Sequence, residues 1–229
     1  MSSVAGAASV EFERGGRGAR KRIIATAIAL FYRNGIHATG MDRVAQHAHV
    51  SKRTLYQHFA TKDELVQEYL RTIDSTRAIP NEEALRAPGL PARDRLLALF
   101  NSTPAARLRG CPFHNAAVEA ADEWPRVHDI VHEHKLAFIA DLIETCQELG
   151  VNDPHQLGHQ LAVVFEGGVA LATTLNDTSP MIYGRLTAET LIDHAMGPAP
   201  IRATRRSPNG TAQTKRQRRA RPDDAKSGE

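Results

Sequence analysis

Apolar residues recur with the period of an α-helix along most of the chain, and this pattern restricts the possible folds more than any other feature. Ile24, Ala27, Ile28 and Phe31 occupy positions i, i+3, i+4 and i+7 of the first such segment, which Gly35 ends. No stretch alternates convincingly with period two, and aromatic residues are only 5% of the sequence. The sequence therefore predicts an all-α fold. The expected helices run from Arg20 to Gly35 and over about residues 40–47, 51–58, 61–78, 92–103, 111–121, 126–149, 155–175 and 187–196.

The two ends of the chain differ in composition from its middle. The beginning is rich in small residues, and the end is polar and basic with almost nothing to bury, so neither is expected to fold. A loop that is a candidate domain boundary is marked by Pro80, Pro88, Gly89 and Pro91. We expect a disordered arm over residues 1–16, a small helical domain over 17–62, a larger helical domain over 63–198 and a disordered basic tail over 199–229.

The net charge of +3 hides a strong separation of charge along the sequence. Within residues 14–62 there are ten Lys and Arg residues against one acidic residue, Asp42. Residues 71–201 carry a net charge of −7, and the tail from Arg202 onward carries +6. A basic segment joined to an acidic body favours a polyanion such as nucleic acid as the partner of the basic segment. A solvated basic face without a partner is the alternative.

Composition excludes several classes of protein. The longest apolar runs are far shorter than the roughly 20 residues that cross a bilayer, and the first residues lack the pattern of a secretion signal. Cys111 and Cys146 are too few for a disulfide scaffold and fit a reducing compartment, so we expect a cytoplasmic protein. The glycine-containing motifs of serine hydrolases, P-loop proteins and dehydrogenases are missing. We therefore expect no enzyme, with an unrecognised catalytic site as the minor alternative.

Two short predicted helices, 40–47 and 51–58, are separated by a three-residue turn, Ala48–Val50. This spacing is typical of a helix-turn-helix, in which the first helix braces the second and the second enters the major groove of DNA. Thr39 and Ser51 are suited to cap the two helices. Small or apolar residues stand where the helices would cross, and hydrogen-bond donors stand on the outward face of the second. The pattern predicts that this outward face contacts DNA.

A distinctive pattern extends over some 45 residues around this motif and reads RIIATAIALFYRNGIHATGMDRVAQHAHVSKRTLYQHFATKDEL. Phe31 and Gly35 close its first helix, Thr39 opens the second, and Lys62 and Leu65 follow the third. This segment resembles the N-terminal domain of the TetR family of bacterial transcriptional regulators. The later stretches RGCPFHNAAVEA and LAVVFEGGVALA are similar to C-terminal domains of a subset of that family. The resemblance implies a homodimeric repressor that binds a palindromic operator and is released by a small molecule.

Two positions depart from the commonest pattern of the family, since His49 and Arg53 stand where glycine is frequent. If the turn needs a positive φ, His49 carries a strain of about 1 kcal/mol. Arg53 adds a cation to the groove face, where it can bind O6 and N7 of guanine. We therefore expect Arg53 to strengthen DNA binding.

The resemblance also implies a division of roles among the residues that face DNA. Phosphate contacts are assigned to Thr39, Tyr56, His58 and Lys62, and the residues nearest the base edges are Ser51, Lys52, Arg53 and Thr54. Arg43 on the first helix of the motif is either a further phosphate ligand or a solvated surface residue. Tyr56 could instead belong partly to the core, and His58 could cap the end of its helix.

By the same resemblance, the second domain would dimerise and bind an effector. A two-fold dimer places two recognition helices in successive major grooves, which one motif alone cannot do. The expected interface residues, on the penultimate helix, are Val163, Val164, Gly167, Gly168, Leu171 and Leu175. The expected effector-pocket residues are Phe100, Phe113, Trp124, His134, Phe138 and Phe165. An ordinary place in the core is the alternative for each of these six.

Four other interpretations remain open. His128 and His132 have a spacing that could hold a divalent metal, but a solvated helix face is favoured, and we expect no metal and no cofactor. Cys111 and Cys146 are either two structural thiols or a redox pair. The basic segment also fits an architectural DNA-binding protein without an effector, although such a protein would not need an acidic helical domain. The basic tail could add non-specific phosphate contacts.

Overall fold

The computed structural model describes residues 18–101, 108–120 and 123–197. Every regular element within these ranges is a helix, which confirms the predicted all-α fold. None of these helices is long and apolar enough to span a membrane. The expected arm and tail lie outside the described residues. The helices are α1 (Ala19–Asn34), α2 (Met41–His47), α3 (Lys52–His58), α4 (Lys62–Ser75), α5 (Pro80–Glu83), the 3₁₀ helix η1 (Ala84–Arg86), α6 (Ala92–Ala98), α7 (Pro112–Ala120), α8 (Pro125–Leu149), α9 (Pro154–Leu175) and α10 (Ser179–Ala195).

Local capping signals fix where the N-terminal helices begin and end. Gly35 has a φ of 93°, and its N–H donates to the last turn of α1 at 2.9 Å. The Ser51 hydroxyl accepts from the Thr54 N–H at 3.0 Å, and the Thr61 hydroxyl accepts from the Glu64 N–H at 3.1 Å. Each bond satisfies a backbone donor that the first turn leaves open. The helix end expected at Gly35 and the cap expected at Ser51 are thus confirmed.

Four predictions of helix boundaries or loops are wrong. Helix α6 ends at Ala98 and not near residue 103, because the Phe100 and Asn101 N–H groups donate to the carbonyls three residues earlier in tighter turns. Helix α4 ends at Ser75, before residue 78, because Arg77 adopts a left-handed φ of 51° and cannot continue it. Helix α10 begins at Ser179, well before residue 187, since Pro180 in its first turn is compatible with a helix start. The segment expected to be a loop contains α5 and η1, and Pro80 is the first residue of α5.

A first hydrophobic cluster joins α1–α4 to α7 and the beginning of α8. The rings of Phe31 and Tyr69 meet edge to face with centroids 5.4 Å apart, and Phe113 and Val127 are fully buried in the same cluster. The described helices form one compact unit. The domain division expected between residues 62 and 63 stays a prediction.

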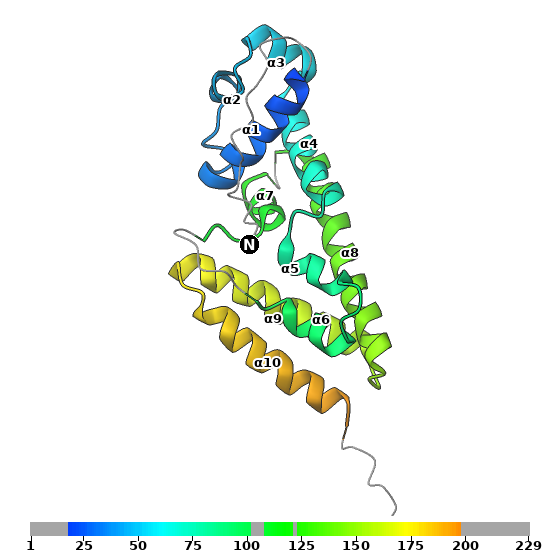
Figure 1. The fold of residues 1–229 in the computed structure, drawn as a ribbon. Helices are drawn as coiled ribbons and strands as arrows, with labels where there is room; N and C mark the ends of the chain where they lie inside the picture. The colour runs from blue at the N-terminus through cyan, green and yellow to red at the C-terminus, as the bar shows by residue number, and fades with distance from the viewer. Residues whose placement is uncertain (1–17, 102–107, 121–122, 198–229) are drawn as a thin grey trace, which may run out of the picture. The chain divides into compact units, whose positions relative to one another are not determined.

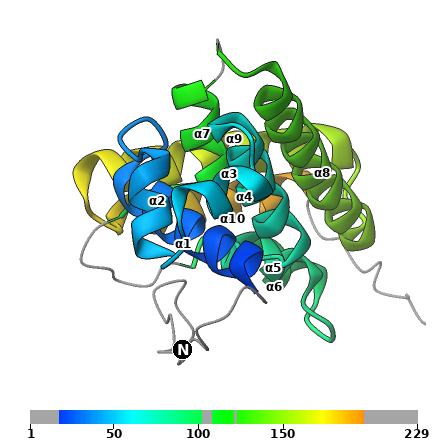
Figure 2. The same ribbon diagram turned by 90° about the horizontal axis from the view of Figure 1, so that it is seen from above.

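A second hydrophobic cluster lies among α6, α8, α9 and α10. Phe165 of α9 is at its centre, with ring centroids 6.0 Å from Phe100 and 5.5 Å from Phe138. Helices α9 and α10 lie side by side, and α8 packs along α9 (Figures 1 and 2). Glycine permits this closeness at Gly158, where a Cβ atom would lie 2.6 Å from Ile143 Cγ1. The two clusters hold the helix-turn-helix and the later helices in one body.

Candidate functional site

The turn between α2 and α3 has the geometry of a helix-turn-helix. His49 takes a positive φ of 51°, as its place in the turn predicts, and the Val50 N–H donates to the Ala45 carbonyl at 3.0 Å. Ala45, Ala48 and Leu55 are buried where the two helices cross, and their small or apolar side chains allow the close approach. The strained His49 backbone costs about 1 kcal/mol. The turn presents the opposite face of α3 to solvent.

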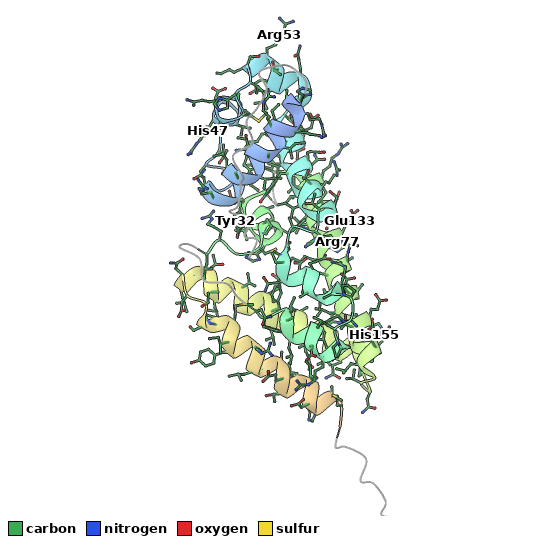
Figure 3. All side chains as sticks on the ribbon, viewed as in Figure 1. Tyr32, His47, Arg53, Arg77, Glu133 and His155 are labelled. Atoms are coloured by element: carbon green, nitrogen blue, oxygen red, sulfur yellow. The ribbon has the colours of Figure 1, made fainter. Side chains whose placement is uncertain are left out.

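The outward face of α3 carries the hydrogen-bond donors that the sequence assigns to DNA. Arg53 lies at the outer end of this region and points away from the other helices (Figure 3). Tyr56 is 48% exposed, so its ring is not part of the core. Thr54 is half-buried, and the other exposed residues of this face are Ser51, Lys52, Arg53 and His58. These side chains form one surface, which we call the α3 face.

Lys52 of the α3 face forms an ion pair with α2. Its ammonium lies 2.6 Å from the Asp42 carboxylate, and both side chains are about two-thirds exposed. The hydrogen bond and the negative charge of Asp42 raise the pKa of Lys52. An ion pair this exposed contributes little to stability, so Lys52 can exchange Asp42 for another anion. Arg43, the neighbour of Asp42 on α2, is also exposed.

Thr39 is placed differently from both of its predicted roles. Gly40, not Thr39, is the N-cap of α2, which begins at Met41. Thr39 is fully buried, and its hydroxyl donates to the Gly35 carbonyl at 2.8 Å. A buried hydroxyl that bonds to the backbone cannot reach a phosphate. The predicted N-cap and phosphate contact are therefore wrong, and Thr39 instead fixes the connection between α1 and α2.

Lys62 and Trp124 meet at a junction between the α1–α2 connection and the α7–α8 region. The Lys62 ammonium donates to the His37 carbonyl at 3.3 Å and lies 5.9 Å from the centroid of the Trp124 ring. Burial lowers the pKa of Lys62 against the opposing effect of Glu119. The Glu119 carboxylate accepts from the His37 N–H at 2.8 Å, and the rings of His37 and Trp124 stack. Trp124 therefore belongs to this junction and not to the expected pocket.

Two cavities lie beside the C-terminal half of α4. The first is enclosed by α4, the α5–η1 segment and α8, and the second lies between α4 and α8. The first cavity has a volume of about 210 Å³, and its apolar wall consists of Ile73, Ile79, Ala137 and Phe138. Its charged wall consists of Asp74, Arg77, Glu82, Glu83, Arg86 and His134. The second cavity, of about 430 Å³, shares Asp74, His134 and Ala137 with the first and includes Glu133. Figure 3 labels Arg77 of the first cavity and Glu133 of the second, on the same side of the molecule.

The aromatic effector pocket expected from the sequence stays a prediction, since only some of its residues line the two cavities. His134 and Phe138 do line the first cavity. Phe113 belongs to the first hydrophobic cluster, Phe100 and Phe165 belong to the second, and none of the three lines either cavity. Large apolar rings at helical spacing are buried in the core, whereas the cavity walls are mostly charged. Sequence reasoning missed Asp74 and Glu82 because neither residue is unusual in its local context.

His134 connects three helices in this region. Its Nδ1 lies 2.8 Å from Asp74 Oδ1 on α4, and its Nε2 lies 3.2 Å from Glu82 Oε2 on α5. Its ring stacks on Phe113 of α7 with centroids 3.5 Å apart. Burial acts to lower the pKa of His134, but the carboxylates of Glu82 and Asp74 outweigh it, and the pKa is raised. His134 therefore links α8 to three other helices and is not an ordinary core residue.

Large apolar side chains are exposed on adjacent faces of α9 and α10. On α9, Val163 is 72%, Leu171 55% and Leu175 61% exposed. A Cβ at Gly167, between them, would meet no atom within 4 Å. The neighbouring exposed residues of α10 are Ile182, Tyr183 and Leu186. We call these residues the α9–α10 face, and large apolar side chains exposed on two packed helices are typical of a protein interface.

Two of the six expected interface residues do not belong to the α9–α10 face. Gly168 is buried, and a Cβ there would lie 3.1 Å from the sulfur of Met181 on α10 of the same chain. Val164 is half-buried and packs against the second hydrophobic cluster. Both residues lie on the side of α9 that faces its own chain, and their place in an interface stays a prediction.

The histidine pair and the two cysteines lie apart from any larger group of metal-binding side chains among the described residues. The rings of His128 and His132 stack with centroids 6.4 Å apart, and the described part of the chain holds no group of three or more metal-binding side chains. Cys111 and Cys146 are unpaired, buried and located in different hydrophobic clusters. Burial raises the pKa of both thiols, that of Cys146 to about 12. Both thiols are therefore protonated at neutral pH.

The all-α fold, the helix-turn-helix and its exposed donor face define a class, the helix-turn-helix regulators. Two family models match the chain. The model for bacterial regulatory proteins of the tetR family matches residues 23–69, and the model for the C-terminal domain of tetracyclin repressor-like proteins matches residues 92–187. Together they cover more than half of the 229 residues. The chain belongs to the TetR family, which consists of regulators and not of enzymes.

Individual relatives agree with this assignment. The chain is 31% identical over 135 residues to the HTH-type transcriptional regulator TtgR of Pseudomonas putida, and the match covers 56% of each protein. It is 48% identical over 46 residues to the HTH-type transcriptional activator FasR of Mycolicibacterium smegmatis, 20% of this chain and 21% of that one. A TetR-family regulator of Streptomyces coelicolor has a similar crystal structure, with a TM-score of 0.70, 29% identity and coverage of 80% of this chain and 92% of that one. The chain thus spans little more than half the length of the Pseudomonas regulator that it matches.

Proposed function

We propose that this chain is a sequence-specific DNA-binding transcriptional regulator that binds its operator through the α3 face. The observation that carries the proposal is the exposed row of donors on a helix that is capped and buried on its other side. Ser51, Lys52 and Arg53 are exposed at the beginning of α3, the part of a recognition helix that reaches base edges. We assign base contacts to these three residues and to Thr54.

Phosphate contacts position such a helix on the duplex without reading sequence. We assign them to Arg43, Tyr56 and His58, which are exposed on α2 and α3. Lys62 is a further candidate, and its ammonium would have to leave the His37 carbonyl to reach a phosphate. The α3 face thus combines both kinds of contact.

We further propose that the α9–α10 face joins two copies of the chain on a palindromic operator. The support for this is the exposed apolar surface of Val163, Leu171 and Leu175 beside that of α10. In a two-fold dimer the two α3 faces can meet successive major grooves about 34–36 Å apart. Such a regulator acts on chromosomal DNA, so we place it in the cytoplasm at the nucleoid.

We propose that the regulator is a repressor and that a small molecule bound in the cavities beside α4 releases it from DNA. The support is the position of the cavities. Both are lined by Asp74, which lies near the end of α4, the helix that follows α3 in the chain. A ligand that binds one arrangement of the two helix-turn-helix motifs of the dimer better than another shifts the population toward that arrangement. The expected result is a change in the spacing of the two α3 faces.

Selection of bound fragments from a random DNA pool tests this proposal. We expect one palindrome to be enriched in the presence of excess non-specific DNA. Arg53→Ala should relax the preference at one position of each half-site by about 1–3 kcal/mol. Arg33→Ala, at an exposed position at the end of α1, is the matched control and should leave the preference unchanged. Binding without any preferred sequence would contradict the proposal and favour an architectural DNA-binding protein.

A further inference from the structure

The C-terminal end of α1 has a hydrogen-bond partner far along the chain. The Tyr32 carbonyl is one of the last four carbonyls of α1, which the helix itself leaves open. The side chain of Arg109 satisfies it, since Nε donates to the Tyr32 carbonyl at 2.9 Å. The positive charge of Arg109 also suits the negative end of the helix dipole. The Arg109 carbonyl accepts from the Asn115 side chain of α7 at 2.7 Å, so the backbone of this capping residue is held as well.

The side chain of Tyr32 makes a second bond in the opposite direction. Its hydroxyl donates to the carbonyl of Gly110, the residue after Arg109, at 3.3 Å. Burial raises the pKa of Tyr32, so this hydroxyl keeps its proton at neutral pH and can donate. Figure 3 labels Tyr32 near the end of α1. Tyr32 is therefore joined to Arg109 through its backbone and to Gly110 through its side chain.

The same stretch of chain contacts the C-terminal end of α9. The Leu108 N–H donates to Asn176 Oδ1 at 3.0 Å, and Asn176 is the C-cap of α9. Gly110 has a φ of 71°, and a Cβ atom there would lie 2.8 Å from Thr173 Oγ1. Glycine thus permits both the left-handed backbone and the close approach to α9. The residues Leu108–Gly110, which we call the 108–110 segment, join the end of α1 to the end of α9.

The two helices that this segment joins belong to different parts of the proposed regulator. Helix α1 packs on α2, α3 and α4, and so carries the helix-turn-helix. At the other end, Asn176 directly follows Leu175, an exposed residue of the α9–α10 face. Bonds that fix α1 against α9 therefore fix the α3 face relative to the surface on which two copies would meet. In a two-fold dimer, this relation sets the distance between the two α3 faces.

We propose that the 108–110 segment determines which spacing of operator half-sites the dimer accepts, with Arg109 and Tyr32 as its positioning residues. This inference rests on the proposed function, since it concerns the operator of a dimer. One additional base pair between the half-sites moves one of them by about 3.4 Å and turns it by about 35° around the DNA axis. The motifs can follow this change only if α1 moves relative to α9, which breaks the bonds of the segment. Without these bonds α4 and α7 still hold the motif, so recognition of a single half-site is kept while more spacings are accepted.

Fluorescence anisotropy with operators of altered spacing tests the proposal on the full-length protein. The palindrome selected from the random pool is compared with versions that have one base pair inserted or removed at the centre, and with a single half-site. Arg109→Ala should reduce the preference for the selected spacing about 10-fold. Tyr32→Phe, which removes a longer and uncharged bond, should reduce it about 2- to 10-fold. Both variants should bind the single half-site like the unaltered protein.

Arg95→Ala is the matched control. Arg95 also donates to a backbone carbonyl, that of Leu85 at 2.8 Å, but this bond joins α6 to η1 and not α1 to α9. We expect this variant to keep the spacing preference of the unaltered protein, although it loses an arginine bond of the same kind.

The outcomes separate this inference from the proposed function. If Arg109→Ala and Tyr32→Phe keep the original spacing preference, the segment does not set the spacing, and the proposed function stands. If they lose half-site affinity as much as palindrome affinity, or if Arg95→Ala relaxes the spacing equally, the role is structural only and the inference is wrong. Should Arg109→Ala fail to fold, Tyr32→Phe, which lacks a single hydroxyl, still decides. An unaltered protein that prefers no palindrome refutes the proposed function, and the inference falls with it.

Discussion

Replacing Leu171 with alanine tests the proposed dimer through a quantity that the structure supplies. Leu171 is 55% exposed in the single chain, and burial of a whole leucine side chain is worth about 1.5–3 kcal/mol. Covering the exposed half therefore contributes about 1 kcal/mol, and a two-fold interface contains this residue twice. The loss of about 2 kcal/mol per dimer raises the dissociation constant about 30-fold. Alanine is the best helix former, so α9 itself is preserved.

Sedimentation equilibrium over a range of protein concentrations measures this constant. Leu136→Ala is the matched control, because Leu136 is 54% exposed on α8 and lies outside the α9–α10 face. We expect the control to dimerise like the unaltered protein. An equal effect of both substitutions, or no effect of Leu171→Ala, would refute the assignment of the interface to this face.

Three further substitutions test individual contacts. Gly158→Ala should lower the free energy of unfolding, measured in urea, by about 1–3 kcal/mol, because the new Cβ would lie 2.6 Å from Ile143 Cγ1 and 3.1 Å from the Ile143 nitrogen. Unchanged stability would show that α8 and α9 can separate at no cost. Thr39→Val should lower the free energy of unfolding by about 1–3 kcal/mol, because it leaves the Gly35 carbonyl without its hydrogen bond, and it should leave the salt dependence of DNA binding unchanged. A reduced salt dependence would instead support the phosphate contact first predicted for Thr39. Burial lowers the pKa of His134, but its carboxylate neighbours raise it overall. The contribution of His134 to the free energy of unfolding is therefore complete below the ordinary pKa of 6.5 and is lost as pH rises through the raised pKa of the folded state. The stability advantage of the unaltered protein over His134→Gln, measured by thermal unfolding, should therefore decline as pH rises above 6.5, and a constant advantage would contradict the charged state of His134.

Features of the fold that depend on neighbouring residues could be predicted from the sequence. The cap at Ser51, the end of α1 at Gly35 and the positive φ of His49 each follow from a few adjacent residues. The apolar period likewise predicts α8 and α9 to within a residue or two. These signals are local, so a single sequence contains them completely.

Features that depend on contacts between distant segments could not be predicted. Thr39 resembles an N-cap, and only the packing of α1 against α2 shows that it is buried and bonded to Gly35. Trp124 resembles a pocket residue until His37 is found stacked on it. Glu82 lies in a segment whose prolines indicated a loop, and its burial depends on α8. His134 was found because it interrupts an apolar stripe, whereas its partners gave no such signal.

The cavities and the helix-turn-helix are joined by two connections, and this explains how a small ligand could act on DNA binding. Helix α4 begins with Lys62 at the junction and reaches Asp74 at the cavities. Its 14 residues span about 21 Å, so a rotation of about 10° at one end moves the other by roughly 4 Å. Helix α7 is the second connection, because Phe113 stacks on His134 and Glu119 binds His37. A ligand that displaces His134 therefore acts on both connections at once. Both helix-turn-helix motifs of the proposed dimer must enter their major grooves together. A shift of this size in each motif is therefore enough to weaken operator binding.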